Sequence, residues 1–405
     1  MIYRRTLIGL MLATAFTAPA LAQDVTIKYM TFSAAPNYLA QLDETVAAFE
    51  AANPGIKVEV ETQSWDAYFT KLQTVVAANQ APDAFELNYE NFVTYAEKGA
   101  LADLTPMLGA DAAAYNPTAL AVFAQDGKQY GLVESFSNVV LFYNKDLFDA
   151  AGVAYPSPDW TWDDELAAAQ KLTGNGVWGS FAPIQFWEFY KTIAQNGGAI
   201  LSPDKQTVTI DSPQNVETLT WMIDKVNTYK VTPSDIDMAG QSSEDLFKAG
   251  KIAMLRTGIW LLGDFTENAK FNWDIALEPG KTTKAHHFFS NGVAVSAKSA
   301  HPDEAYKWIK FLTSSSEAVA IRVKAGWELP AVSDPSAAQA WLDQPVPESR
   351  EVVFQALDTA VVPPVIGNWN QLTDAVGKEL EAAKLGQKTP EQALKDAKVA
   401  IEGLL

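Results

Sequence analysis

The sequence predicts an α/β fold with about two domains, and three observations support this prediction. The chain has 405 residues, which is too long for one ordinary domain of roughly 100–200 residues. Apolar residues make up 48% of the chain, the proportion of a globular protein with a packed core. Along the first part of the chain, segments whose apolar residues alternate with a period of two are followed by segments whose apolar residues repeat with the period of a helix. This succession is typical of an α/β protein.

The alternation of strands and helices is clearest near the N-terminus. The expected elements are strands at 25–29, 56–60 and 84–87 and helices at 39–49 and 65–76. A β-α-β-α-β order implies parallel strands with right-handed crossovers, whose carboxyl ends lie at one edge of the sheet. Ligands bind beyond that edge in open parallel sheets, so loops 30–38, 63–66 and 88–92 are expected to line any site.

The rest of the chain is richer in helices. The predicted elements are helices at 161–172, 186–195, 216–229, 244–249, 303–312 and 389–404 and strands at 252–255 and 288–296. Thr161 is expected to cap the first of these helices, and Thr389 with Gln392 predicts a capping box for the last. No long linker separates two halves, so two lobes would need a chain that crosses between them more than once.

The first 22 residues have the features of a secretory signal peptide. Arg4 and Arg5 precede an apolar stretch at 7–16, and Ala20-Leu21-Ala22 has the small-x-small form of a cleavage site. The stretch is shorter than the roughly 20 residues of a membrane span, and Pro19 interrupts it. We expect an exported protein without a lipid anchor, because no Cys stands at the cleavage site to carry one.

The charge and the cysteine content exclude several classes of function. The chain has 49 acidic and 30 basic residues and a formal charge of −19; removing residues 1–22 takes away two Arg and no acid and leaves −21. Nucleic acids and anionic membranes need clustered Lys and Arg, so neither partner is expected. The absence of Cys excludes disulfides, thiolate nucleophiles and Cys-ligated metals.

No motif for catalysis or metal binding stands out. The sequence has no GxSxG, HExxH or P-loop. His286 and His287 would point to opposite faces of a strand, so they would not share one metal with His301 easily. We therefore expect no metal site, whereas a catalytic pair among the many acids stays an open alternative.

Several tryptophans suggest a sugar ligand. Trp187, Trp260, Trp327 and Trp369 lie beside Gly, Pro or polar residues rather than within apolar runs. An exposed aromatic ring stacks on the C–H faces of a sugar while amides and carboxylates bind its hydroxyls. The alternative for each Trp is a place in the core.

Arginine is scarce, which argues against a polyanionic ligand. Only Arg256, Arg322 and Arg350 follow residue 22. Bidentate capture of phosphate or of several carboxylates favours Arg. A single anionic group held by Arg256 or Arg322 stays an open alternative.

Seven segments form a series along nearly the whole chain. They lie at 49–61, 81–104, 141–153, 160–173, 247–260, 290–312 and 386–397, and they include FEAANPGIKVEVE, LFYNKDLFDAAGV, WTWDDELAAAQKLT and FKAGKIAMLRTGIW. In this order the segments resemble the extracellular solute-binding proteins of carbohydrate ABC importers, the group that includes maltose-binding protein. The resemblance implies a two-lobed periplasmic binding protein fold, each lobe a mostly parallel sheet flanked by helices.

The resemblance also implies boundaries and a mode of action. After a signal peptide at 1–22, the N-terminal lobe would comprise 23–134 plus 286–328 and the C-terminal lobe 135–285 plus 329–405. About three hinge crossings are expected, near 134–137, 286–288 and 326–330. A ligand would bind in the interlobe cleft, the lobes would close, and the closed form would dock on a membrane permease. Such a protein is a periplasmic monomer with no catalytic activity and no cofactor.

Local alignment to this group carries ligand-binding positions over to the chain. Glu90 falls on a sugar-binding acid, whereas Asn91 replaces a sugar-binding Arg and Leu87 replaces a Trp. Trp187 falls on a stacking Tyr and Gln185 on a sugar-binding Glu. The expected ligand contacts are Asn37, Asn88, Tyr89, Glu90, Glu134, Gln185, Trp187, Arg256, Trp260, Trp327 and Trp369.

Two other functions stay open at this point. The same fold could bind a polyamine, a sugar acid or glycerol phosphate. Alternatively, a secreted glycan-acting enzyme would need two carboxyls roughly 5–10 Å apart across the scissile bond. The aligned positions offer amides as well as Glu, which favours a neutral sugar.

Overall fold

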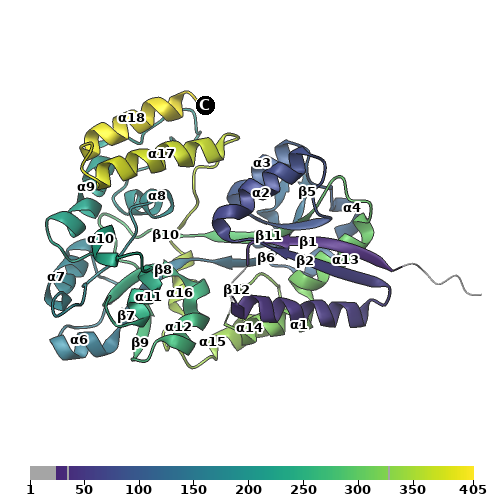
Figure 1. Ribbon diagram of the computed structural model, residues 1–405, viewed down its shortest axis with the longest axis horizontal. Helices are drawn as coiled ribbons and strands as arrows, with labels where there is room; N and C mark the ends of the chain where they lie inside the picture. The colour runs from purple at the N-terminus through teal and green to yellow at the C-terminus, as the bar shows by residue number, and fades with distance from the viewer. Residues whose placement is uncertain (1–23, 34–35, 327–328) are drawn as a thin grey trace, which may run out of the picture.

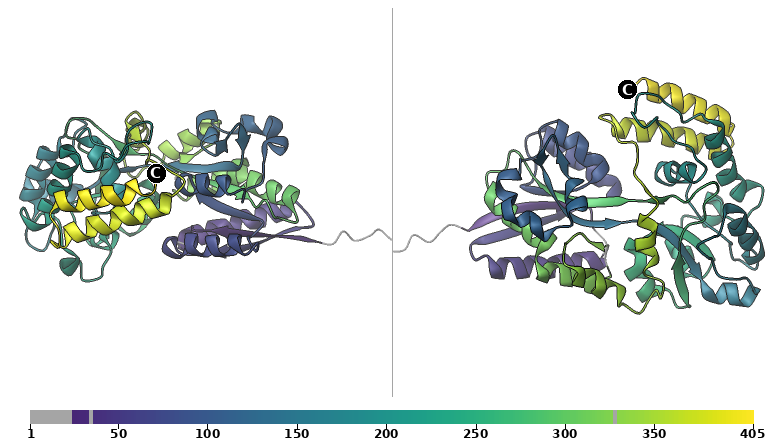
Figure 2. Two further views of the ribbon diagram at one scale, coloured as in Figure 1. Left: turned by 90° about the horizontal axis from the view of Figure 1, so that it is seen from above. Right: turned by 180° about the vertical axis from the view of Figure 1, so that it is seen from behind.

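The computed structural model of the chain describes residues 24–33, 36–326 and 329–405, without the side chains of residues 36, 37 and 66. Two lobes lie side by side, and each combines a β-sheet with helices (Figures 1 and 2). The predicted two-lobed α/β fold is therefore confirmed. The expected signal peptide lies outside the described residues.

The first lobe is built on a six-stranded sheet. Its strands are β1 (Val25–Thr31), β2 (Ile56–Thr62), β3 (Ala84–Asn88), β6 (Gly131–Ser137), β11 (Phe289–Val295) and β12 (Leu329–Pro330). They are hydrogen-bonded in the order β12-β6-β11-β3-β1-β2. As predicted, β1 pairs in parallel with β2 and with β3. The carboxyl ends of these strands point toward the second lobe (Figure 1).

The sheet of this lobe also contains antiparallel strands: β1, β2, β3 and β6 run in one direction, and β11 and β12 run in the other. β11 is antiparallel to both β3 and β6, and β12 is antiparallel to β6. The chain returns from the second lobe at the edge where β3 ends, so β11 has to run in the opposite direction.

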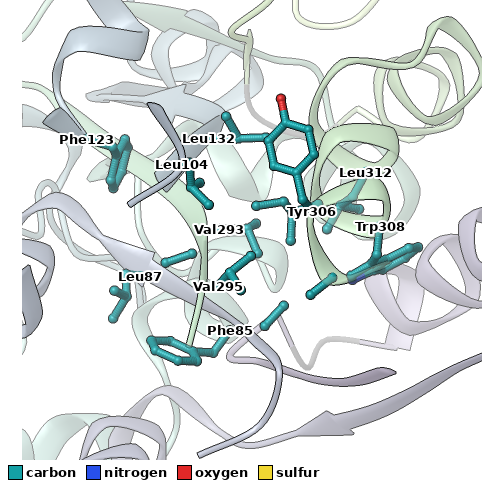
Figure 3. Close-up of a cluster of buried hydrophobic side chains, with 14 of the residues drawn as sticks. Phe85, Leu87, Leu104, Phe123, Leu132, Val293, Val295, Tyr306, Trp308 and Leu312 are labelled. Atoms are coloured by element: carbon teal, nitrogen blue, oxygen red, sulfur yellow. The ribbon is translucent and has the colours of Figure 1, made fainter. Parts of the chain in front are cut away.

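Helices and a hairpin complete the first lobe. They are α1 (Pro36–Ala52), α2 (Trp65–Ala77), α3 (Tyr89–Glu97), α4 (Thr105–Leu108), η1 (Gly109–Ala114), α5 (Pro117–Ala121), the hairpin β4 (Ala124–Gln125) and β5 (Lys128–Gln129), α13 (Pro302–Ser314) and α14 (Ser316–Lys324). Phe85 of β3, Val293 of β11 and Trp308 of α13 are buried in one apolar core (Figure 3). This core fixes the sheet edge that faces the second lobe.

The second lobe contains a three-stranded sheet in the order β8-β7-β9. These strands are β7 (Val139–Asn144), β8 (Met254–Gly258) and β9 (Trp273–Ala276). β7 is antiparallel to both neighbours, so the expectation of a mostly parallel sheet is wrong for this lobe. The reason is that β8 and β9 run in one direction, whereas β7 enters between them from the first lobe.

Most of the second lobe is helical. Its helices and short strands are α6 (Lys145–Ala151), α7 (Trp162–Leu172), α8 (Phe186–Gln195), α9 (Pro213–Asn227), α10 (Asp235–Met238), α11 (Ser243–Lys248), η2 (Ile259–Leu261), α12 (Leu262–Asn268), β10 (His286–His287), α15 (Pro335–Leu342), α16 (Val352–Leu357), β13 (Ala360–Val361), α17 (Trp369–Lys384) and α18 (Pro390–Glu402). Within the described part of the chain, no helix is long and apolar enough to cross a membrane.

The chain passes between the lobes at three places in the described residues. The first is Asn138, between β6 and β7; its side chain donates to the carbonyl of Val353 (2.7 Å). The second is Phe288, between β10 and β11, and the third follows Ser333, before α15. The lobe boundaries stay a proposal. However, β6 and β12 place 135–137 and 329–330 in the first sheet, whereas the sequence-based boundaries assign them to the second lobe.

Local sequence signals fix several helix ends. Thr161 caps α7 in a full capping box with Asp164, because the acidic side chain accepts from the Thr161 amide (2.8 Å). Thr389 accepts from the amide of Gln392 at the start of α18, but the Gln392 side chain donates to Asp396 instead, so only half of that predicted box forms.

Candidate ligand-binding site

Three predicted contacts lie where β3 meets α3. Asn88 ends β3, and Tyr89 and Glu90 form the first turn of α3. The expected loop at 88–92 is therefore a strand end and a helix start. Asn88 Oδ1 accepts from Asn91 Nδ2 at 2.9 Å, which holds this turn. Tyr89 also packs against an apolar cluster of the second lobe, so this turn lies at the contact between the lobes.

Glu90 is a buried carboxylate that the protein leaves incompletely bonded. Glu90 is 5% exposed, and its Oε2 atom has no hydrogen-bond partner among the described residues. Burial raises the pKa of Glu90 to about 7. A buried acceptor without a donor costs folding free energy. Such a group is typical of a ligand-binding site, where the ligand supplies the missing donor.

Tyr190 of α8 offers a second such group from the other lobe. Its hydroxyl is buried and lacks a hydrogen-bond partner in the described part of the chain. Burial raises the pKa of Tyr190 well above its usual range, and the nearby charge of Glu90 raises it further. The two groups therefore lie near each other, although they belong to different lobes. A ligand hydroxyl can donate to the carboxylate and accept from the phenol.

Tyr190 belongs to a continuous band of aromatic rings. We call Trp187, Tyr190, His287, Phe289 and Trp260 the aromatic band. The ring centroids are 5.4 Å apart for Trp187 and His287, 4.9 Å for His287 and Phe289, and 6.0 Å for Phe289 and Trp260. Trp187, Phe289 and Trp260 are partly exposed, so their rings remain accessible to a ligand.

Neighbouring groups orient the two tryptophans of the band. Gln185 directly precedes α8 and accepts from Trp187 Nε1 at 2.9 Å, and His287 Nε2 lies 2.6 Å from the Trp187 carbonyl. Tyr38 of the first lobe donates to the Trp260 carbonyl at 2.5 Å. The Trp260 ring covers Gly258 so closely that a Cβ there would lie 2.1 Å from it, and only glycine fits.

Arg256 contradicts its prediction. Its guanidinium is fully buried in the second lobe, where Nη1 lies 3.2 Å from Glu278 and 3.4 Å from Glu188 and Nη2 contacts Glu165. Three carboxylates already use its donors, so it does not lie at the mouth of a site to hold an anion.

Two further residues that were predicted to contact the ligand, Glu134 and Trp369, interact with other side chains of the protein instead. Glu134 is buried in β6 with Oε1 3.1 Å from Arg322 Nη1, so Arg322 is not available for an anionic ligand either. Burial raises the pKa of Glu134, against the opposing charge of Arg322. Trp369 begins α17 and is buried against Phe186, with the ring centroids 5.3 Å apart. It supports the apolar cluster rather than offering a free face.

Trp327 lies outside the described residues, and so does the side chain of Asn37. Three members of the aromatic band, Tyr190, His287 and Phe289, are absent from the sequence-based prediction. Tyr190 follows Trp187 by three residues on a predicted helix, which places both on one side and could have identified it. His287 and Phe289 adjoin the expected crossing at 286–288, but only the fold brings them to Trp187 and Trp260.

The histidines do not form a metal centre. Burial lowers the pKa of His286 and of His287 to about 3, so both are neutral at physiological pH. His286 Nε2 accepts from the Glu278 amide at 3.1 Å. Among the described residues no three potential ligands are grouped to hold a metal ion.

Comparison with known proteins identifies relatives over nearly the whole chain. The structure of the ABC substrate-binding protein Lmo0181 from Listeria monocytogenes, in complex with cycloalternan, is 49% identical with a TM-score of 0.91 and covers 94% of this chain and 99% of that one. A binding protein of Brucella abortus is 27% identical over 90% of this chain and 89% of its own length. The maltodextrin-binding protein MdxE of Bacillus subtilis is 23% identical over 91% and 88%.

The family model for bacterial extracellular solute-binding proteins matches residues 35–319, more than half of the chain. The two-lobed fold and the ordered sequence segments agree with this match. The chain belongs to the bacterial extracellular solute-binding protein family.

Proposed function

We propose that this protein captures a carbohydrate between its lobes and delivers it to the membrane permease of an ABC importer. The observation that carries the proposal is the pair Glu90 and Tyr190, which present unsatisfied polar atoms from opposite lobes beside the aromatic band. Hydroxyls and C–H faces are what such a combination recognises. Cycloalternan is the first ligand to test, because the relative that is 49% identical was solved in complex with it.

The charges near the site favour a neutral sugar over the alternatives. Glu90 supplies one carboxylate, whose charged form is disfavoured by burial, whereas a polyamine needs several acids around its cationic groups. A sugar acid or glycerol phosphate would need a free cation, whereas Arg256 and Arg322 are engaged by carboxylates. The relatives reported above are binding proteins, which favours a binding function over a glycan-acting enzyme.

A thermal-shift screen separates these ligand classes. Cycloalternan, maltotriose, galacturonate, glycerol 3-phosphate and spermidine are each added to the purified protein. A ligand that binds only the folded state raises the melting temperature, and we expect this result for a neutral sugar. A shift with spermidine or an anion alone would reject the carbohydrate proposal. Release of the aryl group from an aryl glycoside would identify an enzyme.

We also propose that the chain is exported by cleavage after Ala22 and works as a periplasmic monomer without a lipid anchor. Mass spectrometry of the exported protein should then give a chain that begins at Gln23 and carries no lipid. A mass that includes residues 1–22 would contradict the cleavage.

The two accessible tryptophans of the aromatic band should contribute directly to binding. Trp187→Ala and Trp260→Ala are each expected to cost about 1–3 kcal/mol of binding free energy, since a stacking ring is a typical anchor. Calorimetry with cycloalternan measures the loss. Tyr229→Ala is the control, because Tyr229 is an exposed aromatic side chain beyond the end of α9. Equal affinities in all four proteins would remove the band from the site.

A further inference from the structure

The first lobe has a second group of aromatic rings that the site above does not use. Trp65, at the start of α2, is 53% exposed and is the only exposed tryptophan in the described residues. Phe32 and Phe69 contact it at centroid distances of 5.0 Å and 5.3 Å, with interplanar angles of 87° and 85°. Both neighbours meet it perpendicularly, and no ring contact among the described residues is a parallel stack on Trp65.

The fold fixes this ring at the edge that faces the second lobe. Thr31 at the end of β1 pairs with Thr62 at the end of β2, so Phe32 and Trp65 follow adjacent carboxyl ends. Tyr68, one turn after Trp65, donates to the Glu86 carbonyl of β3 at 2.6 Å and ties the start of α2 to the same edge. The position of Trp65 is therefore built into the sheet rather than left to a long loop.

The group is separate from Glu90 but on the same edge. β1 lies between β3 and β2 in the sheet, so the end of β2 is two strand spacings, roughly 10 Å, from the end of β3. One sugar ring held at Glu90 would not also cover Trp65. A ligand that contacts both places needs at least two rings.

Hydrogen bonds to the buried carboxylate of Glu86 hold the segment that carries Phe32. The Ser33 hydroxyl donates to Glu86 at 3.4 Å, and the Phe32 amide donates to the same carboxylate at 3.3 Å. Because Phe32 is fixed in this way and meets Trp65 perpendicularly, the exposed indole is held in place as a stacking surface.

We propose that Trp65 stacks on a sugar unit other than the one held by Glu90 and the aromatic band, so that the natural ligand is an oligosaccharide rather than a single sugar. This inference rests on the proposed carbohydrate function and specifies its ligand.

Calorimetry on wild type, Trp65→Ala, Trp65→Phe and the control Tyr229→Ala tests it, with cycloalternan, maltotriose and methyl α-glucoside as probes. For the oligosaccharide that wild type binds best, Trp65→Ala should lose about tenfold to a hundredfold in affinity. Trp65→Phe keeps a stacking ring and should recover much of this loss, and Tyr229→Ala should bind like wild type. Binding of the single-ring glucoside, where measurable, should not change.

Two results would overturn the inference, and melting temperatures confirm that the variants are folded. An unchanged affinity of Trp65→Ala for the oligosaccharide would exclude the subsite while leaving the proposed function intact. An equal loss for the single-ring glucoside would place Trp65 in the main site instead. If wild type binds none of the carbohydrates, the proposed function fails as well, so the two failures are distinguishable.

Discussion

Replacing Arg256 with Met is expected to destabilise the protein by about 3–5 kcal/mol, because breaking a buried ion network leaves uncompensated charges in the core. The guanidinium contacts Glu165, Glu188 and Glu278, all of which are fully buried. No comparable cation can move in from solvent. The loss should appear as a lower urea midpoint at an unchanged m-value.

The neighbouring lysines compensate only part of this charge. Lys225 lies 3.0 Å from Glu165, and Lys191 lies 2.8 Å from Glu188. Burial alone would raise the pKa of Glu165, but Arg256 and Lys225 hold it well below its usual range. The stability from this carboxylate is therefore present above the unfolded pKa and is lost as the pH falls through the folded pKa.

Lys57→Ala is the control, because it removes a charge that contributes little to stability. Lys57 pairs with Glu50 on the surface of the first lobe and is largely exposed. Its removal should leave the unfolding midpoint nearly unchanged, because exposed ion pairs contribute little. An Arg256→Met variant as stable as this control would show that the network is not needed for the fold.

Glu90→Gln is expected to stabilise the free protein above neutral pH while it weakens ligand binding. The pKa of Glu90 is raised to about 7, so the folded state binds more protons than the unfolded state between about pH 4 and pH 7. Ionisation of Glu90 thus lowers the free energy of unfolding. This cost is absent below about pH 4 and reaches its full value above about pH 7. Removing the charge should recover up to about 3 kcal/mol at pH 8.

The comparison of wild type and Glu90→Gln uses urea unfolding at pH 5 and pH 8 together with calorimetry on cycloalternan. Glu97→Gln is the matched control, because Glu97 ends the same helix in an exposed position. It should change neither stability nor affinity. Lower stability of Glu90→Gln at pH 8, or unchanged affinity, would contradict a carboxylate kept unsatisfied for a ligand.

Local patterns in the sequence were sufficient to predict most elements of the fold. α8 coincides with the predicted helix 186–195, because helical spacing and the Gly-Gly pair after it mark its ends. β8 begins at Met254 rather than at Ile252, which only bridges Trp178. The parallel direction of β1, β2 and β3 was predicted, whereas the directions of β7, β11 and β12 were not, since they depend on the side from which the chain enters each sheet.

The site was predicted less completely, for reasons of tertiary structure. Arg256 stands between Leu255 and Thr257 in a strand, and nothing local reveals that acids from α7 and α8 surround it. Trp369 follows Gly367-Asn368 and so resembles a loop residue, yet α17 begins there and Phe186 covers it. Glu90 was predicted because it falls on a sugar-binding acid of the group that the chain resembles, and it also lies beyond the carboxyl end of a predicted strand, where ligands bind in open parallel sheets.

The central claim is that a sugar is held between the two lobes, and small-angle X-ray scattering tests it most directly. A ligand shifts the population toward a closed form only if it contacts both lobes there, as Glu90 and Tyr190 would require. We expect that cycloalternan at saturation, verified by calorimetry, lowers the radius of gyration. A radius of gyration that stays the same at saturation would contradict capture between the lobes.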